Sequence, residues 1–193
     1  MIVILCGKSA SGKDTTLKKL VEKYNYIPII STTTRPIREG EKNGVDYNFI
    51  SKEEFNWKIA KDMFLEYRSY NTLFNDIPDT WYYGTEKQEL DPKKIYISVL
   101  DFDGAREVQK YYGRDNTIII YISCPDAIRE NRAKHRGSFD QTEWDRRLKD
   151  DEIKFSDDKV NELATMAFMS TYTVDELAAN IDLLVSYAMN PVL

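Results

Sequence analysis

Hydrophobic residues along the chain are gathered into short apolar runs that alternate with amphipathic stretches. The run at 2–6 is short and rich in β-branched residues, which favours a strand. Two later runs, at 95–100 and 117–123, are apolar at nearly every position, as is typical of strands buried on both faces of a parallel sheet. Residues 164–169 form a weaker fourth run. Strands that alternate with helices in this way predict an α/β sandwich.

Helical spacing of apolar residues marks the stretches between these runs. A stripe that begins at Leu17 follows the first run, and a longer stripe from Val174 to Val185 opens with the capping pair Thr173 and Glu176. Besides the helix after the first run, we expect helices over residues 104–112, 126–136, 142–155 and 173–188.

Two regions interrupt this alternation. Residues 31–86 are polar and rich in turns, and short strands at 46–50 and 81–83 predict a small antiparallel insertion. Residues 126–155 are helical but carry many arginines for an acidic protein, so we expect a lid there. The expected organisation is one domain over residues 1–193, with a core of 1–30, 87–125 and 156–193.

Composition narrows the class of function. The 193 residues include 27 Lys and Arg against 32 Asp and Glu, and a net charge of −5 disfavours binding to nucleic acid or to an anionic membrane. No apolar stretch is long enough for a membrane span, and the first run lacks the basic start of a secretory signal, so we expect a cytoplasmic protein. Two cysteines and a single histidine disfavour a disulfide scaffold, a zinc site and a histidine-based triad.

Residues 7–13 read GKSASGK and match the GxxxxGK pattern of a phosphate-binding loop. In this pattern, backbone N–H groups surround a phosphate while the lysine reaches the outer phosphates from the start of a helix. Because the segment follows a predicted strand and opens a predicted helix, we expect it to bind ATP. The expected ATP-binding residues are Gly7, Lys8, Ser9, Ala10, Ser11, Gly12, Lys13, Asp14 and Thr15.

Asp14 stands where the pattern usually has a Ser or Thr that binds Mg²⁺, the cofactor expected to accompany ATP. Two interpretations remain open. Asp14 binds the metal or its water shell, or it only caps the helix start while Thr15 offers a hydroxyl to a phosphate. A carboxylate suits a hard cation but also repels phosphate.

A second anion site is predicted after residue 30. Arg35 and Arg38 accompany a cluster of Ser and Thr hydroxyls and Tyr47, and the planar guanidinium of arginine can hold a phosphate with two hydrogen bonds. A donor loop together with a separate phosphate site is what a phosphoryl transferase needs, since both substrates carry charges that repel each other. This combination indicates a nucleotide kinase.

The segment from Ser31 to Phe49, with its TTR, second arginine, GE, NG and DY, resembles the substrate loop of guanylate kinases, and the similarity extends over nearly the whole chain. The resemblance implies a three-layer P-loop kinase fold, with a β-rich monophosphate-binding insertion at 31–86 and a helical lid at 126–155. It also implies that Ser31, Arg35, Arg38, Tyr47 and Tyr83 hold the phosphate of GMP or dGMP, and that Glu66, Thr85 and Asp103 read the guanine.

The assignment of Glu66 is chemically sensible, because a carboxylate can accept both N1–H and N2–H of guanine and would stay unpaired against adenine. Asp101 and Asp103 follow a buried strand, at the end where open α/β sheets bind ligands. We assign Asp103 to the base and Asp101 to the metal shell; the alternative is that the pair caps the next helix.

In the lid, Arg132 and Arg136 are four residues apart and so lie on one helical face, and Arg147 matches a later arginine of the family. With Lys13, these are the expected catalytic cations, because lid closure brings positive charge to the transferring phosphoryl group and excludes water. Arg129 and Arg146 are expected at the surface or in salt bridges.

The chain also departs from the family pattern. Residues 67–82 are longer than the family spacing and are expected to reshape the acceptor pocket, and Ser170-Thr171 replaces an Asn-Asp pair near the donor base. The expected activity is ATP-dependent phosphorylation of GMP or dGMP by a monomer or homodimer that binds small-molecule nucleotides. The alternatives are a kinase of the same fold acting on another monophosphate or a sugar phosphate, and a non-catalytic binding module.

Overall fold

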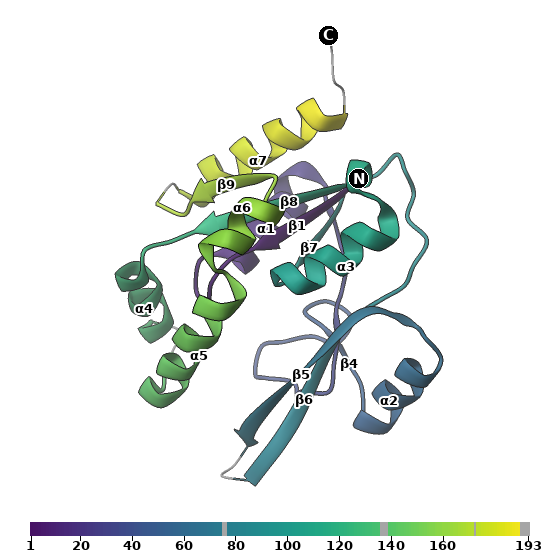
Figure 1. The fold of residues 1–193 in the computed structure, drawn as a ribbon, viewed down its shortest axis with the longest axis vertical. Helices are drawn as coiled ribbons and strands as arrows, with labels where there is room; N and C mark the ends of the chain where they lie inside the picture. Colours follow the sequence, from purple (N-terminus) through teal and green to yellow (C-terminus); the bar gives the residue numbers. More distant parts are fainter. Residues whose placement is uncertain (75–76, 136–138, 172, 190–193) are drawn as a thin grey trace. The chain divides into compact units, whose positions relative to one another are not determined.

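The computed structural model describes residues 1–74, 77–135, 139–171 and 173–189 (Figure 1). The chain folds as two units. The first combines Met1–Pro28 with Pro92–Leu193, and the second is Ile29–Asp91. Of the described helices, none combines the length and apolar character that crossing a membrane requires.

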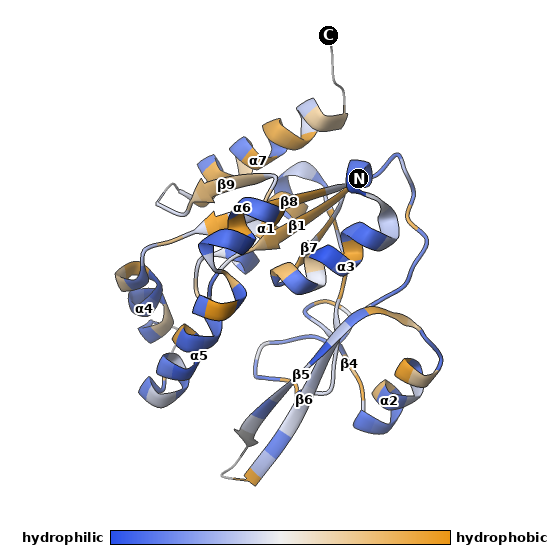
Figure 2. Ribbon diagram, in the orientation of Figure 1, coloured by the Kyte–Doolittle hydropathy of each residue, from blue (hydrophilic) through white to orange (hydrophobic). Residues whose placement is uncertain are grey.

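A five-stranded parallel sheet with strand order β2-β7-β1-β8-β9 forms the centre of the first unit. Strand β1 pairs with β7 on one side and β8 on the other, and Figure 2 shows these three strands as hydrophobic. Every residue of β1 is buried, and the predicted burial on both faces is confirmed for β8, where all residues but Ser123 are buried, whereas the end residues of β7 are only half-buried. The strands are β1 (Ile2–Cys6), β2 (Ile27–Pro28), β7 (Tyr96–Val99), β8 (Thr117–Ser123) and β9 (Met166–Met169).

Helices cover both faces of this sheet (Figure 1). On one face, α1 (Lys13–Tyr24) packs against α7 (Val174–Met189), and their apolar stripes join the strands in a common core. On the other face lie α3 (Phe102–Tyr112) and α6 (Asp157–Leu163), where Phe102 stacks on Tyr121 of β8 at 5.8 Å between ring centroids. The α/β fold with a central parallel sheet is therefore confirmed. A 3₁₀ turn, η1 (Arg114–Asn116), precedes β8, and α4 (Asp126–Lys134) and α5 (Gln141–Lys154) follow it.

The second unit is built on a four-stranded sheet with the order β4-β3-β6-β5. The prediction of an antiparallel insertion is only partly right, because β3 pairs with β4 in parallel while β6 is antiparallel to both neighbours. Residues 34–47 carry the chain back to the end of the sheet from which β3 started, and this return makes the pair parallel. The elements are β3 (Thr32–Thr33), β4 (Asn48–Phe49), α2 (Lys52–Ala60), β5 (Phe64–Phe74) and β6 (Ile77–Glu86).

The hairpin of β5 and β6 has two different faces. Paired residues of an antiparallel hairpin share a face, so Glu66 lies beside Thr85, whereas Tyr67 and Tyr82 lie on the opposite face. Tyr67 and Tyr82 contact Phe55 of α2, with ring centroids 6.4 and 5.4 Å away. Helix α2 therefore packs on the face of the hairpin opposite Glu66.

The predicted helices of the first unit correspond to α1, α3, α4, α5 and α7, and the end of α4 predicted at residue 136 lies outside the described residues. The sequence patterns missed α2 and α6. Helix α2 buries only Phe55, so it has no apolar stripe, and its start is fixed by Ser51, whose Oγ accepts from Glu54 N at 3.1 Å. Strands β2, β3 and β5 were also missed, the first two because they are only two residues long.

Candidate functional site

The loop at residues 7–12 leaves the carboxyl end of β1 and has a shape that two glycines allow. A Cβ on Gly7 would lie 2.6 Å from the carbonyl oxygen of Ile122, so no larger residue fits there. Gly12 has φ of 103° and forms the N-cap of α1. The loop therefore ends at a helix N-terminus, where N–H groups and the helix dipole favour an anion.

Lys13 is the first residue of α1, and its ammonium lies over the loop. Its Nζ donates to the carbonyl oxygens of Gly7 and Lys8 at 2.7 and 2.9 Å. Asp14 and Thr15 follow in the first turn and are exposed. This position is compatible with both interpretations of Asp14, as a metal ligand and as a carboxylate that interacts with the helix dipole.

Arg132 of α4, one of the expected catalytic cations, reaches the phosphate loop. Its Nη1 donates to Ser11 O at 3.1 Å and to Ser170 Oγ at 2.8 Å, and its Nη2 donates to Ser170 O at 3.0 Å. Within the described ranges no carboxylate pairs with it. Arg132 is therefore a cation held at the loop by neutral groups, and its charge remains available for an anion.

The other two expected lid cations are placed differently or not described. Arg147 is half-exposed on α5, where its Nε donates to Glu143 Oε1 at 2.8 Å. Hydrogen bonds from Arg146 and then Arg147 lower the pKa of Glu143 to about 2. Arg136 lies outside the described residues.

A pocket of about 540 Å³ opens beside the phosphate loop in the first unit. Its volume suits a nucleoside-sized ligand, and its wall carries mostly polar side chains together with the apolar Val174 and Leu177. This pocket was not predicted from the sequence, and His135 is exposed beside it. The lining residues are Gly12, Thr15, Thr16, Asn131, Arg132, His135, Ser170, Val174 and Leu177.

The two aspartates after β7, Asp101 and Asp103, have different partners. Asp101 is the N-cap of α3, where its Oδ1 accepts from Gly104 N at 2.9 Å, and its Oδ2 lies 3.9 Å from Lys154 Nζ. This is the capping alternative considered for the pair, and a metal role for Asp101 stays a prediction. Asp103 lies in the first turn of α3 and pairs with Lys159 at 3.1 Å.

In the second unit, Arg35 is buried but keeps its charge. Its Nη2 donates to Glu41 Oε1 at 2.8 Å, and its Cζ lies 5.4 Å from the ring centre of Tyr47 and 5.5 Å from that of Phe49. Burial lowers the pKa of Arg35, but the hydrogen bond to Glu41 and the electrostatic interactions with Tyr83, Glu41 and Tyr47 together outweigh this, and the net pKa is raised. Arg35 is thus a fixed cation between a carboxylate and two aromatic rings.

The other expected phosphate ligands belong to the same unit. Tyr83 of β6 packs edge-on against Tyr47, with ring centroids 6.0 Å apart. Burial raises the pKa of the Tyr83 phenol, and the nearby charges of Arg35 and Arg38 only partly oppose this shift. The phenol is therefore a neutral O–H donor. Arg38 is exposed, and Ser31 is half-buried with its carbonyl accepting from Asn48 N at 2.9 Å.

Glu66 and Thr85 form a buried polar pair on the face of the hairpin opposite Tyr67 and Tyr82. Thr85 Oγ1 donates to Glu66 Oε1 at 2.7 Å, and the two residues are 8% and 1% exposed. The hydrogen bond from Thr85 fixes the orientation of the Glu66 carboxylate. Asp103, the third expected base ligand, belongs to the other unit.

Comparisons with known proteins agree with this geometry. The family model described as guanylate kinase matches residues 1–164. The chain belongs to the guanylate kinase family. It is 37% identical over 135 residues to a guanylate kinase of Helicobacter hepaticus, a match that covers 67% of this chain and 64% of that protein.

One further relative supports membership of the guanylate kinase family, and one solved structure supports the fold. A guanylate kinase of Latilactobacillus sakei is 34% identical over 165 residues, which cover 80% of this chain and 75% of that protein. The crystal structure of guanylate kinase from Anaplasma phagocytophilum superposes with a TM-score of 0.67 at 23% identity, over 96% of this chain and 84% of that one. At this identity the structural match supports the fold alone.

Two residues of these sites, Glu41 and Arg129, have contacts that the sequence did not predict. Glu41 was quoted in the GE pair of the family motif but was given no role, although it positions Arg35. Arg129 was expected at the surface or in a salt bridge; the salt bridge is confirmed and the surface position is wrong, because Arg129 is completely buried against Asp126 and Asp151. No local pattern separates a buried arginine of α4 from its exposed neighbours.

Proposed function

We propose that this chain transfers the γ-phosphoryl group of ATP to GMP or dGMP and releases the nucleoside diphosphate and ADP. The observation that carries the proposal is the buried Glu66–Thr85 pair in the same unit as Arg35 and Tyr83. A carboxylate there suits the two N–H donors of guanine, and the cation and phenol suit a phosphate. The family membership and the phosphate loop supply the donor half of the reaction.

The acceptor is recognised at both of its ends. Arg35, Arg38, Tyr47, Tyr83 and Ser31 bind the monophosphate. Glu66 accepts N1–H and N2–H of guanine, while the Thr85 hydroxyl holds the carboxylate in place, and Asp103 contributes to base binding from α3. Adenine presents an acceptor at N1, so it would leave the buried carboxylate unpaired, which costs more than a missing contact at an exposed site.

The donor is bound at the loop and the pocket beside it. Loop N–H groups and Lys13 hold the outer phosphates, and the 540 Å³ pocket takes the nucleoside part. Arg132, Arg136 and Arg147 stabilise the charge that spreads over the transferring group during an in-line attack. No covalent enzyme intermediate is required, because the protein contributes position and charge.

Magnesium is the expected companion of ATP in this reaction. It is commonly bound by one or two carboxylates together with the substrate phosphates, so a site needs no dense cluster of ligands. The exposed Asp14 carboxylate, next to Lys13 at the start of α1, is a suitable ligand, and Asp101 is a weaker candidate because it already caps α3. When bound, the ion neutralises phosphate charge.

The test is the formation of ADP with Mg-ATP and each of GMP, dGMP, AMP, CMP, UMP and dTMP, with a no-acceptor control. We expect turnover with GMP or dGMP and little with the others. Selective turnover of another monophosphate would replace the guanine assignment with a different acceptor. A folded protein that binds Mg-ATP but phosphorylates no monophosphate would contradict the proposal. The cytoplasmic location, the absence of nucleic-acid and membrane partners, and a monomeric or dimeric state stay predictions.

A further inference from the structure

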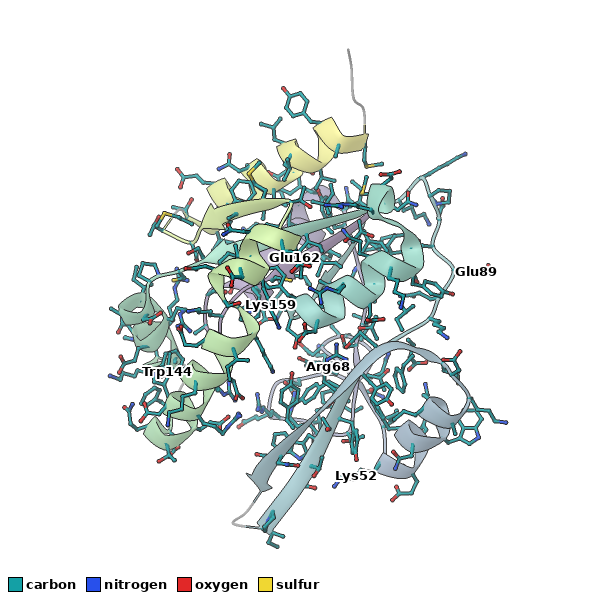
Figure 3. All side chains as sticks on the ribbon, viewed as in Figure 1. Lys52, Arg68, Glu89, Trp144, Lys159 and Glu162 are labelled. Atoms are coloured by element: carbon teal, nitrogen blue, oxygen red, sulfur yellow. The ribbon has the colours of Figure 1, made fainter. Side chains whose placement is uncertain are left out.

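Arg129 is buried at the base of the lid helices. Its exposed fraction is 0%, and the ring centre of Trp144, labelled in Figure 3, lies 5.7 Å from its Cζ. The guanidinium donates to oxygens from three segments of the first unit. These are Ser9 O of the phosphate loop at 3.1 Å, Asp126 Oδ1 of α4 at 2.7 Å and Asp151 Oδ2 of α5 at 3.0 Å.

Asp151 of α5, the ion-pair partner of Arg129, also contacts Ser9. It is 6% exposed, and its Oδ2 accepts from the backbone N–H of Ser9 at 2.7 Å while its Oδ1 accepts from the Ser9 hydroxyl at 3.2 Å. Arg129 and Asp151 therefore hold the N–H, the carbonyl and the hydroxyl of one loop residue. A more exposed pair, Lys8 with Glu152 at 2.6 Å, ties the preceding loop residue to α5.

Stability alone does not explain this arrangement. Removing two charges from water is costly, and apolar residues of similar volume often replace a buried ion pair without loss of stability. Arg129 Nε also has no hydrogen-bond partner among the residues that the structure describes. Apolar residues could not hold Ser9 in this way, because its N–H, hydroxyl and carbonyl need directional hydrogen-bond partners. The carboxylate of Asp151 accepts from the first two, and the guanidinium of Arg129 donates to the third.

We propose that Arg129 and Asp151 are positioning residues that hold the phosphate loop in its ATP-binding conformation. Ser9 lies at the middle of the loop, so a rotation there would redirect the N–H groups that follow it. A displacement of about 1 Å at a reacting group can reduce a rate on the order of 100-fold. The same contacts fix the loop relative to α4 and α5, which carry Arg132 and Arg147.

The decisive variant replaces both charges by apolar side chains of similar size, Arg129→Met with Asp151→Leu. It leaves no uncompensated buried charge, so we expect a melting temperature close to that of the unchanged protein. Ser9 nevertheless loses its hydrogen bonds with Arg129 and Asp151. We therefore expect the Kd for Mg-AMP-PNP, a non-hydrolysable ATP analogue, to rise on the order of 10- to 100-fold, while the Kd for GMP stays unchanged.

Single substitutions give a second, independent measurement. Arg129→Met leaves Asp151 as an unpaired buried carboxylate beside the loop and is expected to impair both folding and ATP binding. Arg129→Lys keeps the charge, but one ammonium cannot serve three oxygens in the geometry of a guanidinium. We expect Arg129→Lys to fold and to show an intermediate Kd for Mg-AMP-PNP.

The matched control is Lys134→Met, which removes an exposed ion pair with Glu130, at 2.7 Å, from the same helix. It should leave both affinities unchanged. The proposal is overturned if the double variant, folded and stable, binds Mg-AMP-PNP as tightly as the unchanged protein, or if Arg129→Lys does so.

In enzyme assays, a positioning role predicts a larger change in KM for ATP and in kcat than in KM for GMP. A purely structural role would lower the melting temperature and leave these constants alone. The inference rests on the proposed function only through these assays. If the unchanged protein phosphorylates no monophosphate but binds Mg-AMP-PNP, and the double variant loses that binding, the proposed function fails and the positioning role stands.

Discussion

The phosphate loop of the first unit is built from backbone, whereas the acceptor site of the second unit is built from paired side chains. In the loop, Gly7 and Gly12 permit a conformation that presents N–H groups, and a helix begins directly behind it. In the acceptor site, Arg35 is held by Glu41 and Glu66 by Thr85. Both sites are proposed to bind a phosphate group, and they would do so by different means.

This difference predicts how each site responds to substitution. A backbone-built site loses function when a single side chain that completes it is removed or when its conformation is disturbed. A site of paired side chains loses specificity when one partner changes, because the remaining partner is left without its match. Substitutions in the two units should therefore separate ATP constants from GMP constants.

The largest effect is expected from Lys13→Ala. The loop would keep its shape, but the cation that reaches the outer phosphates would be gone, and we expect kcat to fall on the order of 1,000-fold. The melting temperature should change little, because water can replace the ammonium as donor to the carbonyls of Gly7 and Lys8. Lys23→Ala, on the same helix and exposed, is the control. Near-normal turnover of Lys13→Ala would break the assignment of the loop to ATP.

The loop was predictable from sequence because its geometry is local. GxxxxGK fixes a turn, an N-terminus and a lysine within seven consecutive residues, and no distant contact is needed to recognise them. The three buried strands were equally accessible, since residues buried on both faces give continuous apolar runs. Here sequence and structure agree to within a residue for β1 and β8.

The acceptor site and the lid were less accessible to prediction from the sequence alone. Residues of β5 mix aromatic and polar types, so neither helical nor strict strand periodicity identifies it, and the pairing of Glu66 with Thr85 depends on the register of the hairpin. The burial of Arg129 depends on the packing of α5 on α4. A charged residue is rarely expected inside unless its partner, here Asp151, is known beforehand.

A second prediction concerns specificity in the side-chain-built site. Glu66→Gln replaces a carboxylate that can accept two hydrogen bonds by an amide with only one acceptor oxygen. We expect kcat/KM for GMP to fall about 100-fold, while KM for ATP is unchanged. Steady-state kinetics with each substrate varied in turn measures both constants.

The control for Glu66→Gln is Glu89→Gln, which makes the same chemical change at an exposed position of the second unit (Figure 3). Equal kcat/KM for GMP in Glu66→Gln and the unchanged protein would remove Glu66 from the base site. A parallel rise in KM for ATP would contradict the separation of the two sites.

A smaller effect is expected from Tyr83→Phe. Burial raises the pKa of this phenol, so it is protonated at neutral pH and can donate a hydrogen bond to a phosphate oxygen. Loss of that single bond to a charged group should raise KM for GMP about 10-fold and leave KM for ATP unchanged. Tyr67→Phe lies on the opposite face of the hairpin and should change neither constant. An unchanged KM for GMP in Tyr83→Phe would exclude the phenol from phosphate binding.

The smallest effect is expected from the ion pairs that Glu143 forms with Arg146 and Arg147 on α5. Hydrogen bonds from Arg146 and Arg147 lower the pKa of Glu143 from 4.5 to about 2. A carboxyl whose folded pKa is depressed stabilises the protein above its unfolded pKa, and this contribution is lost as the pH falls from about 4.5 to about 2. Because the Glu143 side chain is 40% exposed, so that solvent screens its ion pairs, we expect Glu143→Gln to reduce the free energy of unfolding at neutral pH by about 0.5 kcal/mol or less. Urea unfolding between pH 7 and 2 measures it: the difference between Glu143→Gln and the unchanged protein should disappear at the acid end. A difference that persists or grows there would mean that Glu143 stabilises α5 by something other than its charge.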